Sequence, residues 1–477
     1  ERCADRVNPI FLRELQQALN AKSFLGVVAL ALATVFFIGL MIALRVDREL
    51  ESGRGVFIPT LMVLLPVMTM VLPMQAFNSM QHELREGAID QLLMSELTPR
   101  RIVRGKLLAS ALLGMVFMAM FAPLLAVCYL LRGIDVATIA ICLSFAFLFG
   151  LAAAAVGMAM GAVTLIKPLQ HVARAGVSAA LAALTIGLMG SVWGIVRDVV
   201  RLRTPADQQG LVVTGIAIVA GIVLMNMVAA AVLTHPHENR STPFRVFPFA
   251  LTGLAYGLAA WMARLPGELQ GFSLVWTLAC ALGGIPFLLA GLTENRTLSP
   301  RVRTLVPKNR LLAALSVPFL PGSDRAMWFL VLLLGVPGLA AWVCAGASPR
   351  STVAWMERLV LFACAYVLIW GCVLRMLRGN RPGQRPRIHA LVGLLFLFAV
   401  VCAVPMVVDL ARFGEVEHWS WLHLLNPFFT MNDSGSFGEP RVLAALYVLG
   451  GVLLLLRLPG MFAGVREVLE ASRARAR

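Results

Sequence analysis

The fold of this chain is decided around residues 78–106, NSMQHELREGAIDQLLMSELTPRRIVRGK, a charged stretch between two long apolar runs. Within it, apolar residues recur at three- and four-residue spacing, which predicts an amphipathic helix with one apolar stripe. Because the flanking runs are long and apolar enough to cross a bilayer, we expect this stretch at a membrane surface, facing water or a partner. The acidic residues that lie off the stripe are Glu83, Glu86, Asp90 and Glu96.

Turn signals divide the stretch into three parts. We expect a short helix over about residues 79–85, a turn at Gly87, where glycine permits backbone angles that other residues resist, and a second helix over 88–97. Thr98 is then expected to cap a third helix, with Pro99 at its first position. A polar helix pair joined rigidly to a membrane span would act as a lever for a soluble partner.

Composition places the chain among polytopic membrane proteins. Its mean hydropathy is +0.82, with 59% hydrophobic and 14% charged residues. A bilayer crossing needs about 20 apolar residues, and on that criterion we predict an all-α transmembrane helical bundle of about twelve spans. The candidate spans lie near 24–44, 56–77, 107–131, 136–165, 176–196, 211–233, 248–264, 272–292, 326–347, 353–374, 389–410 and 441–458.

The two halves of the chain share one layout of short outer and longer inner segments, which predicts a six-plus-six parallel repeat. No residue-level identity links the halves, so the duplication is a hypothesis. The predicted parts are an interfacial helix at 1–23, a first half at 24–233, a linker at 234–247, a second half at 248–458 and a basic cytoplasmic tail at 459–477.

The net charge of +16 does not indicate nucleic-acid binding. Lysines and arginines gather in short stretches that abut spans, on the side that is cytoplasmic when the N-terminus is inside, as the positive-inside rule requires. We therefore predict a multi-pass protein with both termini cytoplasmic and with contacts to membrane lipid, and no nucleic-acid partner.

The N-terminal region is predicted to be a helix lying in the membrane interface, capped by Asn8 and begun by Pro9. Polar residues, including Arg13 and Glu14, face away from its apolar side. The alternative is a simple cytoplasmic cap. The apolar side comprises Ile10, Phe11, Leu12, Leu15, Ala18 and Leu19.

These two segments resemble parts of a known family. The order Glu83-x-x-Glu86-Gly87-x-x-Asp90-x-Leu92-Leu93, then Thr98-Pro99, resembles the cytoplasmic coupling segment of type-2 ATP-binding-cassette exporter permeases. Residues 8–15 are similar to the interfacial elbow helix of that family. The resemblance covers about residues 8–235 and is only topological beyond them. Ala88 departs from the pattern, since the family more often has threonine there.

The resemblance implies a permease subunit in a bacterial-type inner membrane, driven by a separate nucleotide-binding ATPase that docks on residues 78–106. ATP and magnesium would belong to that partner, and this chain would hold no cofactor. The substrate, and whether one chain, a homodimer or a second permease completes the pathway, stay open. The residues implied in coupling are Glu83, Glu86, Gly87 and Asp90, with Leu92 and Leu93 seating the helix and Thr98 and Pro99 starting the next one.

The sequence shows no motif for ATP binding, catalysis or metal binding. Gly105-Lys106 is followed by Leu107, so the P-loop pattern that surrounds phosphates with backbone amides is absent. No catalytic residues are predicted. No metal site is predicted either, because His235 and His237, like the pair His418 and His423, have no third or fourth ligand nearby. The scarcity of ionisable residues within spans disfavours a proton-coupled carrier.

Two other function classes remain as alternatives: a membrane scaffold that anchors a cytoplasmic ATPase or an envelope-assembly complex, and an autonomous secondary carrier. Two segments also keep two interpretations each. Residues 293–325 are either a second contact for the ATPase or a basic juxtamembrane loop. Residues 411–440, rich in Trp and Leu, are either a substrate gate or an interfacial anchor.

Overall fold

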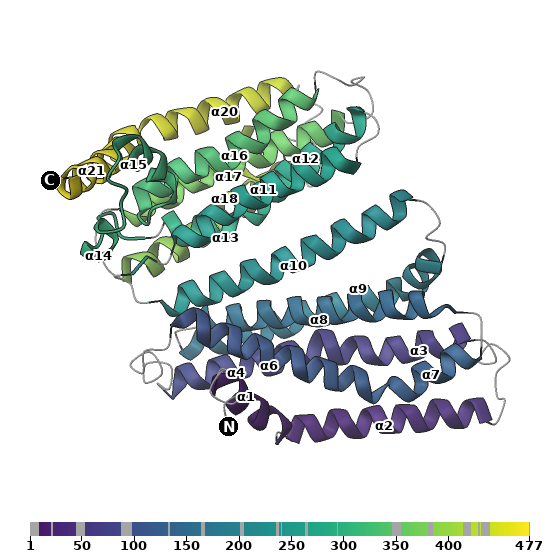
Figure 1. Cartoon of the computed structure of the whole chain (residues 1–477). Coiled ribbons are helices and arrows are strands. Elements are labelled where there is room, and N and C mark those ends of the chain that lie inside the picture. The colour runs from purple at the N-terminus through teal and green to yellow at the C-terminus, as the bar shows by residue number, and fades with distance from the viewer. Residues whose placement is uncertain are drawn as a thin grey trace. The chain divides into compact units, whose positions relative to one another are not determined.

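The computed structural model is built of helices, and the described residues contain no strand (Figure 1). They form two compact units, Glu1–Thr234 and His235–Arg477, each considered by itself below. The structure describes residues 9–20, 22–43, 53–86, 98–131, 134–163, 167–200, 205–234, 238–239, 241–262, 266–292, 294–345, 354–379, 385–413, 421–427, 430 and 439–476.

Within these residues, eight helices are long and apolar enough to cross a membrane, and nine if a pair bent by 46° counts as one span. The prediction of an all-α, multi-pass membrane protein is therefore confirmed, whereas twelve spans and a six-plus-six repeat stay predictions. The eight are Phe24–Met41, Gly53–Arg85, Pro99–Met120, Val136–Ala162, Gln209–Leu233, Ser323–Val343, Met356–Arg378 and His389–Ala411; the bent pair is Pro440–Leu455 with Leu458–Arg475.

The first unit consists of a short N-terminal helix followed by long apolar helices that lie side by side (Figure 1). The predicted third span is interrupted at Phe121, next to Pro123. The elements are α1 (Pro9–Leu19), α2 (Lys22–Ala43), α3 (Gly53–Pro66), η3 (Val67–Val71), α4 (Leu72–Arg85), α6 (Pro99–Met120), α7 (Ala122–Leu130), α8 (Val136–Val163), α9 (Lys167–Val200) and α10 (Pro205–Leu233).

The second span is one continuous helical run, α3–η3–α4, that carries prolines at seven-residue spacing: Pro59, Pro66 and Pro73. Proline lacks an N–H, so its helix must rearrange locally, and here five residues form a π-helical turn. The short separate helix predicted over 79–85 is wrong, because those residues are the polar end of this span.

Helix α8 packs against this proline-rich span along a face of glycine and alanine. A Cβ at Gly157 would lie 2.6 Å from the backbone oxygen of Pro73, and one at Gly161 would lie 2.9 Å from that of Phe77. Without a side chain at these positions the two backbones approach closely, as small residues allow in membrane helix pairs. This crossing fixes the position of α4, whose end carries Glu83.

The second unit is also a helical bundle, with short helices at its polar end. Helix α11 begins at Thr242, inside the predicted linker, and the span predicted over 272–292 is interrupted at Gly284. Its elements are α11 (Thr242–Met262), α12 (Pro266–Gly283), α13 (Ile285–Leu292), α14 (Pro300–Arg303), α15 (Arg310–Ser316), η4 (Val317–Phe319), α16 (Ser323–Ala345), α17 (Ala354–Arg378), α18 (Arg385–Phe413), η5 (Trp421–Leu425), α20 (Glu439–Leu455) and α21 (Leu458–Ala476).

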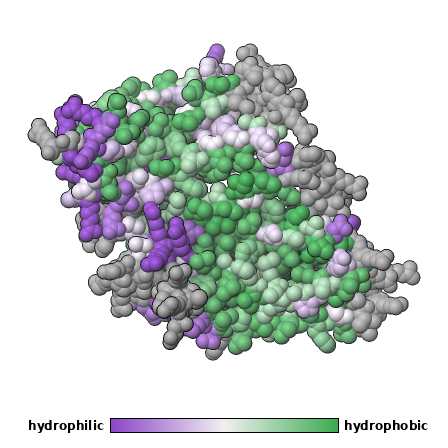
Figure 2. Space-filling model, viewed as in Figure 1, coloured by the Kyte–Doolittle hydropathy of each residue, from purple (hydrophilic) through white to green (hydrophobic). Residues whose placement is uncertain are grey.

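The predicted basic tail is a packed helix. Val468 and Ala471 of α21 lie in one apolar cluster with Val302, Ala313 and other residues of the segment between α13 and α16. In Figure 2 hydrophilic residues gather at the end of this unit where Figure 1 labels α14 and α21, and hydrophobic residues cover the flanks of the long helices. The tail is therefore part of the second unit's fold.

Candidate functional site

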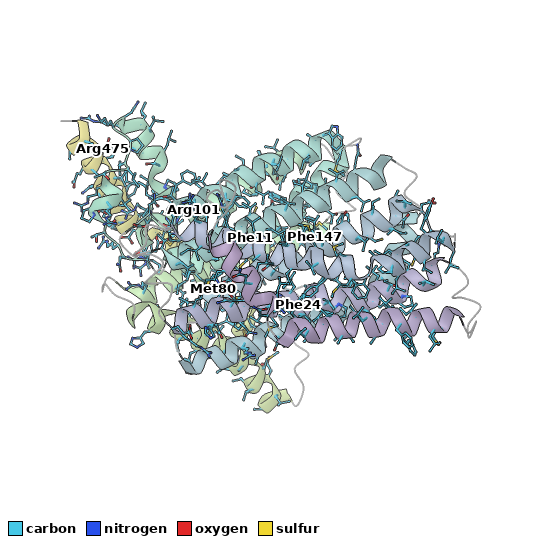
Figure 3. The ribbon with its side chains drawn as sticks, turned by 60° about the horizontal axis from the view of Figure 1, so that its bottom comes forward. Phe11, Phe24, Met80, Arg101, Phe147 and Arg475 are labelled. Atoms are coloured by element: carbon cyan, nitrogen blue, oxygen red, sulfur yellow. The ribbon has the colours of Figure 1, made fainter. Side chains whose placement is uncertain are left out.

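Three elements of the first unit meet where the predicted coupling segment leaves and re-enters the bundle. Helix α1 packs on α6, and α4 packs on α6 as well. Figure 3 labels one residue from each: Phe11 of α1, Met80 of α4 and Arg101 of α6. Residues 87–97 lie outside the described residues, so α4 and α6 are the two stems of that segment.

A buried lysine joins the three helices. The Nζ of Lys106, on α6, lies 2.5 Å from Oε1 of Glu14 on α1 and 3.0 Å from Oε2 of Glu83 on α4. The three side chains are 3%, 8% and 4% exposed, respectively. One cation thus holds two carboxylates from two different helices away from water.

Two further side chains complete this group, which we call the Lys106 cluster: Arg13, Glu14, Ser79, Glu83 and Lys106. Lys106 donates to the hydroxyl of Ser79 at 2.7 Å, and Ser79 donates to Oε2 of Glu14 at 2.7 Å. Arg13 donates to Oε1 of Glu83 at 3.1 Å. The cluster therefore contains two acidic and two basic side chains, and each carboxyl group accepts from at least one donor.

The electrostatics explain why the cluster survives burial. Burial favours the protonated form of Glu14, but the charge of Lys106 and hydrogen bonds from Lys106 and Ser79 outweigh it, so the pKa of Glu14 is lowered. Removing one partner of a buried ion pair leaves an uncompensated charge and costs about 3–5 kcal/mol. Loss of any one charged member of the cluster would therefore destabilise the place where the three helices meet.

The acidic residues predicted to face a partner separate into two kinds. Glu83 is buried in the Lys106 cluster, so the expectation that it lies on a partner-facing surface is wrong. Glu86 has an exposed carboxylate, 3.1 Å from Nδ1 of His82. Helix α4 ends between them, at Arg85, and its last turn points one acid inward and leaves the other outside.

The predicted start of the third helix is confirmed. Thr98 is the N-cap residue of α6 with extended backbone, and Pro99 is its first residue. The backbone oxygen of Thr98 accepts from the N–H of Arg101 at 2.8 Å, whereas its hydroxyl makes no cap hydrogen bond. The other predicted coupling residues lie outside the described residues: Gly87, Asp90, Leu92 and Leu93.

A helix, α1, is present where the interfacial helix is predicted, and its position in a membrane interface stays a prediction. Phe11 and Leu15 are half-buried, and Pro9 and Leu12 lie within the helix, whereas Asn8 is outside the described residues. Glu14, which the sequence pattern placed on the water-facing side, instead points into the protein. The sequence feature that could have indicated a buried partner for Glu14 is Lys106, a basic residue beside Leu107 at the start of an apolar run.

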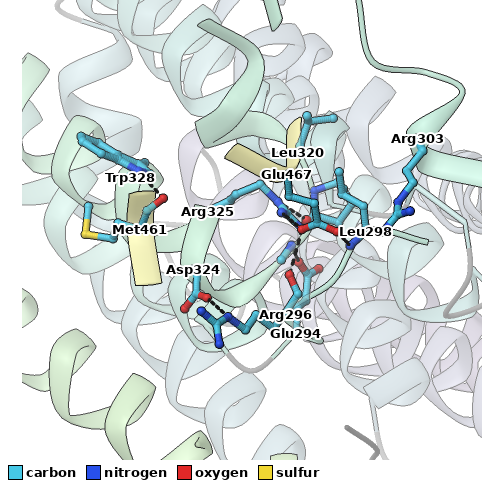
Figure 4. A network of polar contacts seen from close by, with 12 residues as sticks. Glu294, Arg296, Leu298, Arg303, Leu320, Asp324, Arg325, Trp328, Met461 and Glu467 are labelled. Atoms are coloured by element: carbon cyan, nitrogen blue, oxygen red, sulfur yellow. Dashed lines mark hydrogen bonds and ion pairs between the residues drawn. The ribbon is translucent and has the colours of Figure 1, made fainter. Parts of the chain in front are cut away.

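The second unit contains its own buried charge network at its polar end (Figure 4). Arg325, fully buried, donates to Glu467 of α21 at 2.8 Å and to the backbone oxygen of Pro321 at 2.7 Å. Asp324 accepts from Arg375 of α17 at 2.6 Å and also pairs with Arg296 at 2.6 Å. These contacts tie the start of α16 to α17 and α21.

The same network gives the segment predicted over 293–325 a fixed fold. Arg245 of α11 donates to Glu294 at 2.9 Å and to the backbone oxygen of Leu320 at 2.6 Å, and the N–H of Gly322 donates to Glu294 at 2.7 Å. Gly322 has a φ of 136°, a conformation that glycine adopts readily. The beginning of the described segment, at Glu294, is therefore joined to its end, at Gly322, and both are held by Arg245.

The described part of segment 411–440, which is predicted to lie on the outer side, is anchored to the second unit by polar contacts. His423 in η5 pairs with Asp409 of α18, and both side chains are buried. Tyr366 of α17 donates to the backbone oxygen of Leu424 at 2.7 Å, and Thr430 donates to that of His423 at 2.6 Å. These contacts fix η5 against two membrane helices.

Comparison with known proteins gives no relative, since no family model, curated protein or solved structure matches the chain. The described residues also hold no group of three or more His, Cys, Asp or Glu side chains arranged to bind a metal ion. The Lys106 cluster is therefore the candidate functional site, on its geometry alone.

Proposed function

We propose that this chain is the membrane-spanning permease subunit of an ATP-binding-cassette exporter, in a bacterial-type cytoplasmic membrane. A separate nucleotide-binding subunit, docked on residues 78–106, would bind and hydrolyse ATP with magnesium. The observation that supports this most directly is the Lys106 cluster, because it joins both stems of that segment to the N-terminal helix through buried ion pairs.

The cluster supports a mechanical role. A force applied to residues 87–97 reaches α4 and α6 directly along the chain, and the pairs of Lys106 with Glu83 and Glu14 would make α4, α6 and α1 move together. Helix α4 is the end of a 33-residue apolar run, so a displacement of its polar end tilts a whole span. Rigid movement of packed helices is one of the established ways to switch a membrane pathway between its two sides.

Two features of the chain support an external source of energy. The chain has no P-loop pattern, and the buried ion pairs described above lie at helix ends, in or beside polar segments. A proton-driven carrier would place an ionisable group within its transport pathway. An external ATPase acting on a cytoplasmic segment is consistent with both features.

The test begins with an ATPase that co-purifies with the tagged chain, reconstituted with it in proteoliposomes. Glu86→Lys reverses an exposed charge at the docking segment and should weaken binding of the ATPase. Lys106→Met should leave binding of the ATPase intact but uncouple ATP hydrolysis from transport, because α1, α4 and α6 would no longer move together when the docking segment is displaced. Asp135→Asn removes an exposed charge outside residues 78–106, just before α8, and should change neither.

Three outcomes would count against this function. If no ATPase co-purifies, a carrier that works alone becomes the better account. If an ATPase binds, but its ATP hydrolysis does not respond to any solute and no solute flux requires ATP hydrolysis, the chain is a scaffold. If Lys106→Met behaves like Asp135→Asn in the coupled assay while its fold is intact, the Lys106 cluster does not transmit the movement of the docking segment.

A further inference from the structure

Helix α15 and the turn before it expose leucines at the polar end of the second unit. Leu311 and Leu315 are 75% and 70% exposed, and two basic residues, Lys308 and Arg310, precede them in sequence. The opposite side of the same helix is buried: Ala313 and Val317 pack against α21. The leucine face, as we call it, consists of Leu305, Leu311, Leu312 and Leu315.

The position of the leucine face relative to the membrane surface follows from the candidate span that comes after it. Helix α15 passes through η4 into α16, a membrane-capable helix that starts at Ser323. Trp328, in the second turn of α16, packs against the same apolar cluster as α15 and donates to the backbone oxygen of Met461 at 3.3 Å. Tryptophan favours the membrane–water boundary, so α15 lies where the span enters the bilayer.

The charge beside the leucine face is positive. Residues 294–322 contain five basic residues; Arg296, Arg301 and Arg303 pair with Asp324, Glu238 and Glu467, whereas Lys308 and Arg310 are exposed. The single acidic residue of this range, Glu294, is buried. Helix α21 adds cations at the same place, because Ser472 donates to the backbone oxygen of Lys308 at 3.0 Å and Arg475 donates to that of Val306. The basic residues beside the face are Lys308, Arg310, Arg473 and Arg475.

We propose that the leucine face of α15 inserts into an anionic lipid surface, with Lys308 and Arg310 contacting the lipid phosphates. Leucines would enter the boundary between headgroups and acyl chains, as in amphipathic helices that lie in the membrane plane. The basic residues would favour negatively charged headgroups over neutral ones. This surface anchors the polar end of the second unit to the bilayer, and it does not depend on the proposed transport function.

The test uses the full-length chain in nanodiscs of phosphatidylcholine alone or mixed with phosphatidylglycerol. A fluorescent amino acid replaces Leu311, and the control carries it at Arg301, an exposed residue of the same segment that pairs with Glu238 at 3.2 Å. Lipid with brominated acyl chains quenches a reporter in the membrane, and iodide quenches one in water. The two reporters thereby separate burial in lipid from exposure to solvent.

We expect brominated lipid to lower the fluorescence at position 311 roughly two-fold and to leave position 301 unchanged. Phosphatidylglycerol should increase protection from iodide at 311, and high salt or Lys308→Gln with Arg310→Gln should remove that increase. Iodide quenching at 311 equal to that at 301 in both membranes would overturn the proposal. So would protection that requires an added protein, or equal protection with and without phosphatidylglycerol.

Discussion

Lys106 and Glu14 lie 92 residues apart in the sequence, yet their Nζ and Oε1 atoms are 2.5 Å apart inside the first unit. Glu14 belongs to a helix expected to lie along the membrane, and Lys106 to the start of a span. Their contact ties the N-terminal helix α1 to α6, and through Glu83 to α4, at the two ends of the segment 87–97. It also makes the stability of this corner sensitive to single substitutions.

Lys106→Met should destabilise the first unit by about 3–5 kcal/mol, because Glu14 and Glu83 would then be buried without their shared cation. Denaturant titration in micelles, with steric trapping as a second readout, measures the change. Arg104→Met, on the same helix but exposed, should change stability by less than about 0.5 kcal/mol. Equal effects of the two substitutions would contradict the role of burial.

Glu14→Gln should flatten the acid dependence of stability. Burial by itself would raise the pKa of this carboxyl, but Lys106 and Ser79 together lower it by more than burial raises it. The pKa in the folded state therefore lies below the ordinary value of 4.5. The ionised group therefore stabilises the fold above that pH, and the contribution is lost as pH falls through the folded pKa. The unfolding temperature of the wild type should fall more steeply in acid than that of the variant, and parallel curves would refute this.

Arg325 and Arg303 offer a matched comparison, since both pair with Glu467. The Arg325 side chain is fully buried, and that of Arg303 is 54% exposed. Arg325→Met should cost about 3–5 kcal/mol and loosen α21 from α16, whereas Arg303→Met should cost less than about 1 kcal/mol. Protease accessibility of α21 checks the loosening, and a reversed order would show that the network is not what holds the helix.

Gly157→Ala should destabilise the first unit by about 1–3 kcal/mol, because its Cβ would overlap the backbone oxygen of Pro73, which cannot move independently of its helix. Gly221→Ala is the control: nothing lies within 4 Å of a Cβ there, and alanine favours helix. A disulfide-crosslinking comparison of α4 and α8 would report their separation. An unchanged separation in Gly157→Ala would mean that the crossing tolerates the extra methyl.

The candidate site could be predicted only in part, for reasons visible in Glu14 and Glu83. Both lie on polar sides of amphipathic helices, and periodicity separates polar from apolar sides without saying whether water or another helix meets the polar one. Lys106 stands at the end of a basic run, where the positive-inside rule already accounts for a cation. Each residue thus had a simpler explanation in the sequence than the one its contacts provide.

The sequence by itself determined that this is a helical membrane protein, where several of its spans run and where α6 begins, because bilayer burial and proline-start chemistry act on contiguous residues. Only the tertiary structure decided that α4 continues through residues 79–85, that the predicted tail packs as α21, and that Glu14, Glu83 and Lys106 share one buried site. Those outcomes depend on which helices become neighbours, and pairing between distant charges leaves no periodic trace along the chain.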